Sequence, residues 1–249
     1  MTIPTVPRIF SHNRRLLRAE RAERRTGQEE CASWLMDEIE HDLIERIGFM
    51  KFEPARALIL GRGHGQLEAA LERQACQVVA IQAPDEEQPI TGAPFDLIVS
   101  LARLDTVNDL PGALIHLRTA LGESGILLAS FVGAGSLPAL RQIMLAADGD
   151  RPAARLHPQI DSRAASTLLQ RVGFTRQVVD TLPLRLRYSA LNRLIADLRD
   201  QGLTNALADQ PPTLGKSALA RARAAFDNLR DDDGRVTETF EIMTLTVWR

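Results

Sequence analysis

The stretch of the sequence with the clearest chemical potential is a glycine-rich turn after a short apolar segment. Ala57 to Leu60 predict a buried strand, and Gly61, Gly63 and Gly65 follow it directly. Glycines at this spacing let the backbone pass close to a ligand, as in many nucleotide-cofactor pockets. The same glycines also let any strand turn sharply into a helix, so the pattern is compatible with a cofactor turn or with a purely structural turn.

Metal and disulfide chemistry find no support in the sequence. Cys31 and Cys76 lie 45 positions apart and form no CxxC motif. His64 sits inside the glycine loop, but no cysteine, histidine or carboxylate follows at ligand spacing. We therefore predict no metal site, an exposed loop position for His64, and a reducing, cytoplasmic setting.

The composition suits one soluble globular domain, residues 1–249. The chain has 45% hydrophobic and 25% charged residues and a net charge of -2. This charge gives no argument for a nucleic-acid partner. No apolar run reaches the roughly 20 residues that span a bilayer, so we predict no transmembrane segment.

Apolar runs alternate with segments of helical periodicity, which predicts an α/β fold with a doubly wound, mostly parallel sheet. The alternation in the last segment suits an antiparallel strand. We expect a helical extension over 1–50, a cofactor-side half over 51–135, and a C-terminal half over 136–249 with a helical insertion at 189–230. The predicted strands lie near 57–60, 77–82, 95–100, 125–132, 176–188 and 236–248, and the predicted helices near 11–48, 66–74, 111–121, 136–147, 162–172, 189–201 and 216–229.

With its glycine loop after the first strand and its terminal antiparallel strand, the chain resembles the class I S-adenosyl-L-methionine (SAM)-dependent methyltransferases. The segments "IFSHNRRLLRAERAERR", "FDLIVSLARLDTVNDLPGAL" and "DGRVTETFEIMTLTVWR" resemble the mitochondrial complex I assembly factor of that fold and its bacterial relatives, and more loosely the malonyl-carrier-protein methyltransferase of biotin synthesis. The resemblance implies SAM as cofactor and a protein partner, with a respiratory-complex subunit as the candidate. It also implies cofactor contacts at Gly61, Gly63, Gly65, Gln82, Ser100 and Leu101.

Two departures from the family pattern fall at the cofactor site. An acidic residue usually binds both ribose hydroxyls, and this chain has Gln82 there. Only twelve residues, 83–94, separate Gln82 from Phe95, whereas a complete strand–helix–strand crossover takes about 30. We therefore predict that the third strand and its helix are deleted. The acidic residues Asp85, Glu86 and Glu87 could replace lost contacts if this loop folds back.

The sequence does not identify a catalytic residue, because methyl transfer depends on positioning the two reactants more than on a fixed catalytic triad. Asp105 could act as a base or cap the following turn, and we favour the cap. His157 lies in a segment that the family uses near the substrate entrance, and Tyr188 ends a strand that borders the pocket in this fold. An ordinary structural role explains Tyr188 equally well, and we favour such a role for His157. Arg103 faces the same mouth and could meet an acidic substrate or remain solvated.

Two functions compete on this basis. Under the first, the protein binds a protein partner and its SAM binding is weak or lost. Under the second, it is an active SAM-dependent methyltransferase with a remodelled pocket. The N-terminal arginine helix could be a solvated helix or a docking surface, and its few apolar residues predict that it is held loosely. Its six arginines are Arg14, Arg15, Arg18, Arg21, Arg24 and Arg25.

Overall fold

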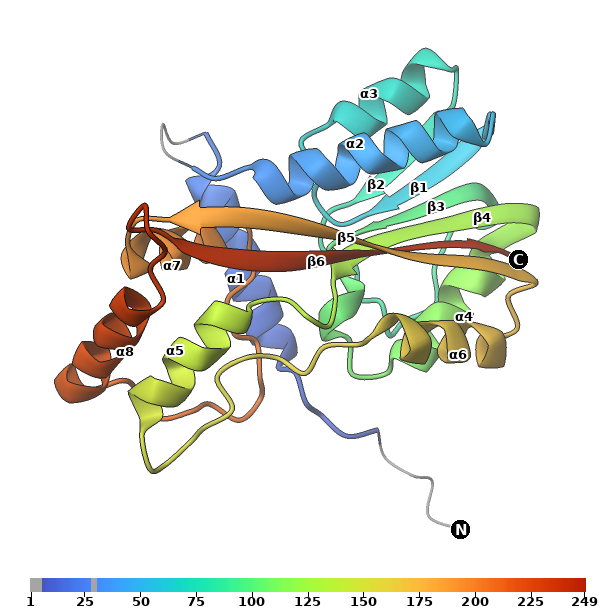
Figure 1. Ribbon diagram of the computed structural model, residues 1–249. Helices are drawn as coiled ribbons and strands as arrows, with labels where there is room; N and C mark the ends of the chain where they lie inside the picture. The colour runs from blue at the N-terminus through green and yellow to red at the C-terminus, as the bar shows by residue number, and fades with distance from the viewer. Residues whose placement is uncertain (1–5, 28–30) are drawn as a thin grey trace, which may run out of the picture.

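The computed structural model describes residues 6–27 and 31–249. The helical prediction over 11–48 is wrong at 26–27 and 31–33, which are not helical, and its part at 28–30 lies outside the described residues. A six-stranded sheet in the order β2-β1-β3-β4-β6-β5 organises the molecule (Figure 1). The strands are β1 (Arg56–Leu60), β2 (Gln77–Ile81), β3 (Phe95–Leu101), β4 (Leu121–Val132), β5 (Arg176–Tyr188) and β6 (Val236–Trp248). The helices are α1 (His12–Arg25), α2 (Trp34–Phe49), α3 (Gln66–Arg73), α4 (Leu110–Ala120), α5 (Pro138–Asp148), α6 (Ser162–Val172), α7 (Leu191–Asp200) and α8 (Lys216–Asn228), with a short 3-10 turn, η1 (Leu104–Thr106).

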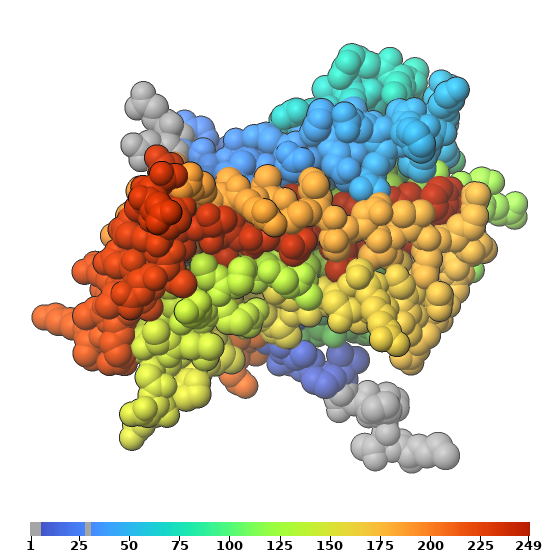
Figure 2. All heavy atoms as spheres, in the orientation of Figure 1, coloured from blue at the N-terminus to red at the C-terminus, as the bar shows by residue number. Residues whose placement is uncertain are grey.

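The sheet is parallel from β2 to β4 and antiparallel at β6 and β5, as predicted. The deletion is confirmed: residues 82–94 contain neither helix nor strand, and β2 is the edge of the sheet. Because no third strand pairs with β2, the chain passes from β2 directly to the far side of β1. The other edge is β5, which runs in orange across the face shown in Figure 2, between α2 above and α5 and α6 below.

Alternation along the buried strands builds two cores, one on each face of the sheet. In β1, Ala57 and Ile59 pack with α2 and α3, whereas Leu58 and Leu60 pack on the opposite face with α4 and α6. Strands covered on both faces are apolar at every position, which is why these segments read as continuous hydrophobic runs. A third core lies where α5, α7 and α8 pack together with the ends of β5 and β6.

One predicted boundary after α4 is wrong, the start of β4. We expected "GESG" at 122–125 to end the helix and the strand to begin near Gly125. The helix ends at Ala120, and Leu121 already begins β4. Phe95 pairs with Leu121, and Leu97 pairs with Ile126. The residues between Leu121 and Ile126 therefore form an irregularity in the β3–β4 register and continue β4 as extended backbone.

Candidate functional site

The glycine loop lies at the carboxyl edge of the parallel strands, where α/β proteins bind their ligands. Gly61 and Gly65 adopt φ values of 103° and 87°, in the left-handed region that favours glycine. The Gly61 N–H donates to the Ile81 carbonyl at 2.9 Å, which ties the loop to the end of β2. The backbone geometry of a cofactor turn is therefore present.

A carboxylate from α2 fills the inner side of this loop. Glu40 accepts from the His64 N–H at 2.6 Å and from the Gln66 N–H at 2.9 Å. A Cβ at Gly63 would lie 1.8 Å from Oε1 of Glu40, so the space left open by this glycine is occupied by the carboxylate. Glu40 is 1% exposed, and its backbone donors satisfy a charge that would otherwise be costly to bury.

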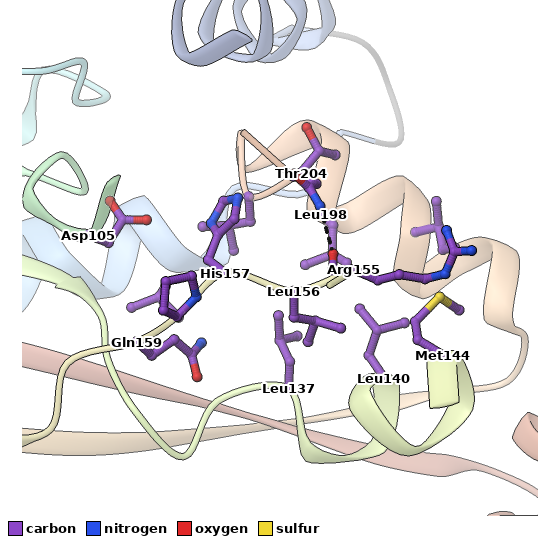
Figure 3. A pocket seen from close by; sticks show the side chains of 15 residues that line it. Asp105, Leu137, Leu140, Met144, Arg155, Leu156, His157, Gln159, Leu198 and Thr204 are labelled. Atoms are coloured by element: carbon purple, nitrogen blue, oxygen red, sulfur yellow. Dashed lines mark hydrogen bonds between the residues drawn. The ribbon is translucent and has the colours of Figure 1, made fainter. Parts of the chain in front are cut away.

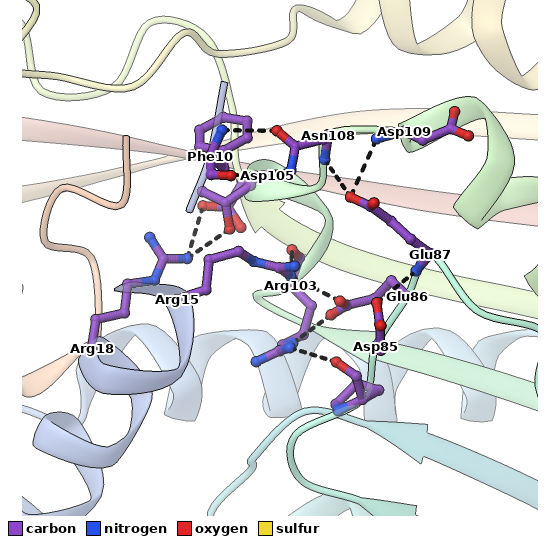
Figure 4. A network of polar contacts seen from close by, with 12 residues as sticks. Phe10, Arg15, Arg18, Asp85, Glu86, Glu87, Arg103, Asp105, Asn108 and Asp109 are labelled. Carbon is purple, nitrogen blue, oxygen red and sulfur yellow. Dashed lines mark hydrogen bonds and ion pairs between the residues drawn. The ribbon is translucent and has the colours of Figure 1, made fainter. Parts of the chain in front are cut away.

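A network of two arginines and one glutamate lies beside the first glycine of the loop (Figure 4). Glu86 lies between Arg15 of α1, at 2.9 Å, and Arg103 after β3, at 2.6 Å. The Glu86 side chain is 0% exposed, and Arg103 also donates to the Pro84 carbonyl at 3.0 Å. Cγ of Arg103 lies 3.0 Å from where a Cβ of Gly61 would be, so this side chain passes directly over the first glycine.

A second contact fixes α1 to the same edge. Arg18 lies 3.7 Å from Oδ2 of Asp105 and donates to the Thr106 hydroxyl at 2.9 Å. Burial lowers the pKa of the Arg18 guanidinium, and burial raises the pKa of Asp105 despite the neighbouring arginines. The expectation of a loosely held, solvated α1 is therefore wrong for Arg15 and Arg18, which are both buried. Arg103 is only partly buried, but it is not a freely solvated arginine either, because it pairs with Glu86 at 2.6 Å.

The residues predicted to contact a cofactor surround this closed edge. Gln82 is exposed, and its Oε1 accepts from Arg62 at 3.2 Å. Ser100 and Leu101 are buried at the end of β3; the Ser100 hydroxyl has no hydrogen-bond partner among the described residues, and the Leu101 carbonyl faces Gly61. Glu86 does fold back, as considered above, but it pairs with arginines.

Three other predicted positions take structural roles. The prediction that Asp105 caps the following turn is wrong: Asp105 lies inside η1, and α4 is capped by Asp109, which accepts from the Gly112 N–H at 2.9 Å. Tyr188 is 4% exposed in the third core, where burial raises its pKa. His64 is exposed, as predicted, and its Nδ1 lies 2.7 Å from Oδ1 of Asp37. Among the residues that the structure describes, no group of His, Cys, Asp and Glu side chains is arranged to hold a metal ion.

A cavity of about 170 Å³ lies beside the closed edge (Figure 3). Asp105 and His157 line it, so the structure brings these two predicted residues to one site, without Tyr188 or the glycine loop. Arg155, Gln159, Thr204 and Asn205 add polar groups. The apolar wall is formed by Val132, Leu137, Leu140, Met144, Leu156, Pro158, Ile195, Leu198 and Leu203.

His157 is held in its uncharged form. Its Nε2 accepts from the Ala206 N–H at 2.6 Å, which places the ring proton on Nδ1, and its ring packs edge-on against Phe10. Burial, followed by the charges of Arg18 and Arg14, lowers the pKa of His157 to about 3. The ring thus has a fixed tautomer at neutral pH.

The lowered pKa of His157 predicts a specific acid sensitivity. The folded pKa of about 3 lies below the ordinary value of 6.5, so the unfolded chain takes up a proton first as the pH falls. The stability contribution is complete above pH 6.5 and is lost as the pH falls toward 3. Between pH 7 and pH 5 the unfolding free energy should fall by about 2 kcal/mol more in the wild type than in His157→Gln. Urea titrations at both pH values measure this difference, and equal losses would contradict the assignment.

Sequence reasoning missed Glu40, although its position carried a signal. Glu40 precedes Leu43 by three residues and Ile47 by seven, so it belongs to the stripe of α2 that packs on the sheet. A charged residue in such a stripe needs a buried partner. The loop amides of His64 and Gln66 supply it.

Comparison with known proteins gives a consistent picture. A family model described as "Methyltransferase domain" matches residues 24–179. Arginine-hydroxylase NDUFAF5, mitochondrial, of Homo sapiens is 30% identical over 176 residues, which cover 69% of this chain and 51% of the relative. The chain thus spans about half the length of the arginine-hydroxylase relatives that it matches.

A second group of relatives matches more of the chain. Malonyl-[acyl-carrier protein] O-methyltransferase of Gallionella capsiferriformans is 25% identical over 252 residues, covering 88% of this chain and 86% of the relative. Among solved structures, the YcgJ protein of Bacillus subtilis has a TM-score of 0.54 at 11% identity and covers 84% of this chain and 98% of that chain. This structural similarity supports the fold alone.

Proposed function

Since the chain belongs to the methyltransferase domain family, we propose that it is a divergent member whose SAM binding is weakened or lost, and that it acts by binding a protein partner. SAM is the cofactor of the family, as the sequence predicts. The observation that carries the proposal is the buried Glu86 carboxylate, held between Arg15 and Arg103 above Gly61.

The residues at the carboxyl edge do not fit SAM as they stand. The space beside Gly61 is taken by the Leu101 carbonyl and by Arg103, and the space beside Gly63 is taken by Glu40. Gln82, in place of the usual acidic residue, already accepts from Arg62. Admitting a ligand would require breaking buried charge pairs, which costs several kcal/mol when one partner is left behind.

One observation favours the alternative, an active SAM-dependent methyltransferase. Gly61 and Gly65 keep left-handed backbone after β1. A turn with a purely structural role could use another backbone geometry and other residues, so the retained glycines favour a turn that binds a ligand. Under this alternative α1 moves away when the cofactor binds and carries Arg15 with it. The malonyl-[acyl-carrier protein] relative, named as an O-methyltransferase, is consistent with it.

The proposed partner is a protein, with a respiratory-complex subunit as the candidate. Support comes from the family resemblance of the sequence and from the relatives named arginine-hydroxylase NDUFAF5, mitochondrial. Those names belong to the relatives. No helix among residues 6–27 and 31–249 is long and apolar enough to cross a membrane. The cytoplasm stays our prediction for the location of this chain.

A titration series with SAM and S-adenosylhomocysteine tests the closure of the edge. Gln82→Glu alone should not tighten binding appreciably, because the new carboxylate pairs with Arg62 while Arg103 still covers Gly61. Combining it with Arg103→Ala opens the loop and should tighten binding about tenfold or more, since a hydrogen bond to a charged group contributes about 1.5–3 kcal/mol.

Gln88→Glu, an exposed substitution in the same loop, is the matched control for added charge. If Gln82→Glu alone strengthens binding as much as the double variant does, the edge is already open. The alternative of an active enzyme would then take precedence.

A further inference from the structure

The deletion after β2 leaves a strand with one unpaired side. In the part of the chain that the structure describes, β2 pairs only with β1, in parallel register from Arg56 opposite Gln77 to Leu60 opposite Ile81. β2 and β5 are thus the two edges of the sheet (Figure 1). Unpaired N–H and C=O groups along an edge are a template for a further strand, so β2 is a place where the sheet can be extended.

Two residues of β2 direct their backbone groups outward. The N–H of Gln77 and the carbonyl of Ile81 form hydrogen bonds with the chain at the two ends of β1, at 2.8 and 2.9 Å. Because successive residues of a strand turn their backbone groups to opposite sides, the odd-numbered residues of β2 bond to β1. The N–H and C=O groups of Val78 and Ala80 therefore point away from it. Ala80 is exposed and Val78 is half-buried, so this side of the strand is accessible.

The β2 edge lacks the features that protect the β5 edge. Charged side chains and proline on an edge strand oppose pairing with another chain. Residues 74–84, which include β2, contain no charged side chain, and their one proline, Pro84, follows the strand. β5 has four charged side chains and one proline within the strand: Arg176, Asp180, Pro183, Arg185 and Arg187. The two edges differ as expected if β2 pairs with another strand and β5 does not.

The outward groups of β2 match those of a second copy of the same strand. When two β2 strands are placed antiparallel with Val79 on the two-fold axis, Val78 of one copy lies opposite Ala80 of the other. Both residues turn their N–H and C=O groups outward, so each such pair exchanges two hydrogen bonds and the two pairs exchange four. This register also pairs all five residues of β2.

The side chains of β2 are compatible with this register. Val79 lies opposite its own copy, and Gln77 lies opposite Ile81. Ile81 is 37% exposed, and in this pairing it becomes a diagonal neighbour of Val79 of the other copy on the same face of the sheet. No charged side chain of either β2 strand opposes the approach. The pairing therefore covers an apolar side chain and brings no like charges together within the strands.

The same comparison of edges favours a closed pair over a filament. Pairing of β2 with β5 of the next molecule would repeat without end, because each molecule would still offer one free edge. Pro183 and the charged side chains of β5 oppose that arrangement. Pairing of β2 with β2 uses the same edge on both molecules and closes after two copies.

We propose that two copies of this chain form a dimer by antiparallel pairing of their β2 strands about Val79, which joins the two six-stranded sheets into one. This inference goes beyond the proposed function and does not depend on whether SAM binds. The second copy takes the place beside β2 that the deletion leaves unpaired.

Sedimentation velocity and amide hydrogen exchange of the full chain test the proposal together. Because two five-residue strands make a small interface, we expect mostly monomer at about 1 μM and mostly dimer at about 200 μM. Exchange of the Val78 and Ala80 amides should slow at least about threefold between these concentrations, whereas exchange along β5 should not change. A monomer at 200 μM, or a dimer that leaves exchange at Val78 and Ala80 unchanged, would overturn the proposal.

Two variants at one exposed position of β2 test the same register. Ala80→Pro removes two of the four hydrogen bonds between the copies and retains the bonds to β1, so it should raise the dissociation constant of the dimer at least about tenfold. Ala80→Lys should act in the same direction by placing two ammonium groups near the axis.

Gln88→Lys, at an exposed position of the following loop, is the matched control for added charge and should leave the dimer unchanged. Urea denaturation shows whether each variant is folded. Folded Ala80 variants that dimerise as strongly as the unaltered chain would contradict the pairing. The exchange measurement on the unaltered chain decides the question even if both variants fail to fold.

Discussion

Glu86→Ala should lower the free energy of unfolding by about 3–5 kcal/mol, the cost of removing one partner from a buried ion pair. Glu86 is the carboxylate that the Arg15 and Arg103 guanidinium groups share, at 2.9 and 2.6 Å, with its side chain fully buried. Its loss leaves two cations facing each other where little solvent screens their repulsion. Urea denaturation of the full chain, followed by circular dichroism, measures the effect.

Two further variants show whether this cost comes from the network. Asp85→Ala, at an exposed position of the same loop, should change stability by less than about 0.5 kcal/mol. The triple variant Arg15→Met, Glu86→Leu, Arg103→Met removes all three charges together and should recover most of the loss. A Glu86→Ala protein as stable as Asp85→Ala would show that the network is not formed in solution.

Arg18→Glu should destabilise the protein by more than about 3 kcal/mol, because it places a second carboxylate beside the buried Asp105. In the wild type Arg18 lies 3.7 Å from Asp105 and also donates to Thr106 and to the Thr204 carbonyl. The substitution replaces an attraction by a repulsion and leaves these acceptors without their donor. Thermal and urea denaturation both report it.

Arg21→Glu is the control on the same helix. Arg21 is exposed, and its Nε donates to the Leu17 carbonyl within α1. Exposed charges contribute little, so its effect should stay below about 0.5 kcal/mol. Similar, small effects at Arg18 and Arg21 would contradict this prediction. They would show that α1 is a solvated basic helix that does not pack against the closed edge.

The contrast between these arginines shows what the sequence can and cannot predict. Strand positions, sheet direction and the deleted third strand follow from local patterns: continuous apolar runs, glycine turns and a twelve-residue gap. Burial of Arg15 and Arg18 depends on partners 71 and 88 positions away. No local periodicity contains that information, and counting charges along α1 suggests exposure.

The candidate site divides in the same way. The glycine loop could be predicted because it rests on one residue type at one point of the chain, and the cost of Gln82 for SAM binding stays a prediction. The cavity could not, since its wall combines residues from β4, α5, the segment before α6, α7 and the turn after α7. Asp105 was a candidate from the sequence, but its burial beside Arg18 depends on the position of α1.

The dissociation constant of SAM for the unaltered chain, measured by isothermal titration, tests the central claim most directly. A loop covered by Arg103 and filled by Glu40 should bind SAM no more tightly than about 100 μM. S-adenosylhomocysteine should have a similarly high dissociation constant, because both ligands would bind at the same carboxyl edge of the sheet. A dissociation constant in the low micromolar range would contradict the account, since it would mean that α1 and the 82–94 loop open at little cost and that the cofactor site is intact.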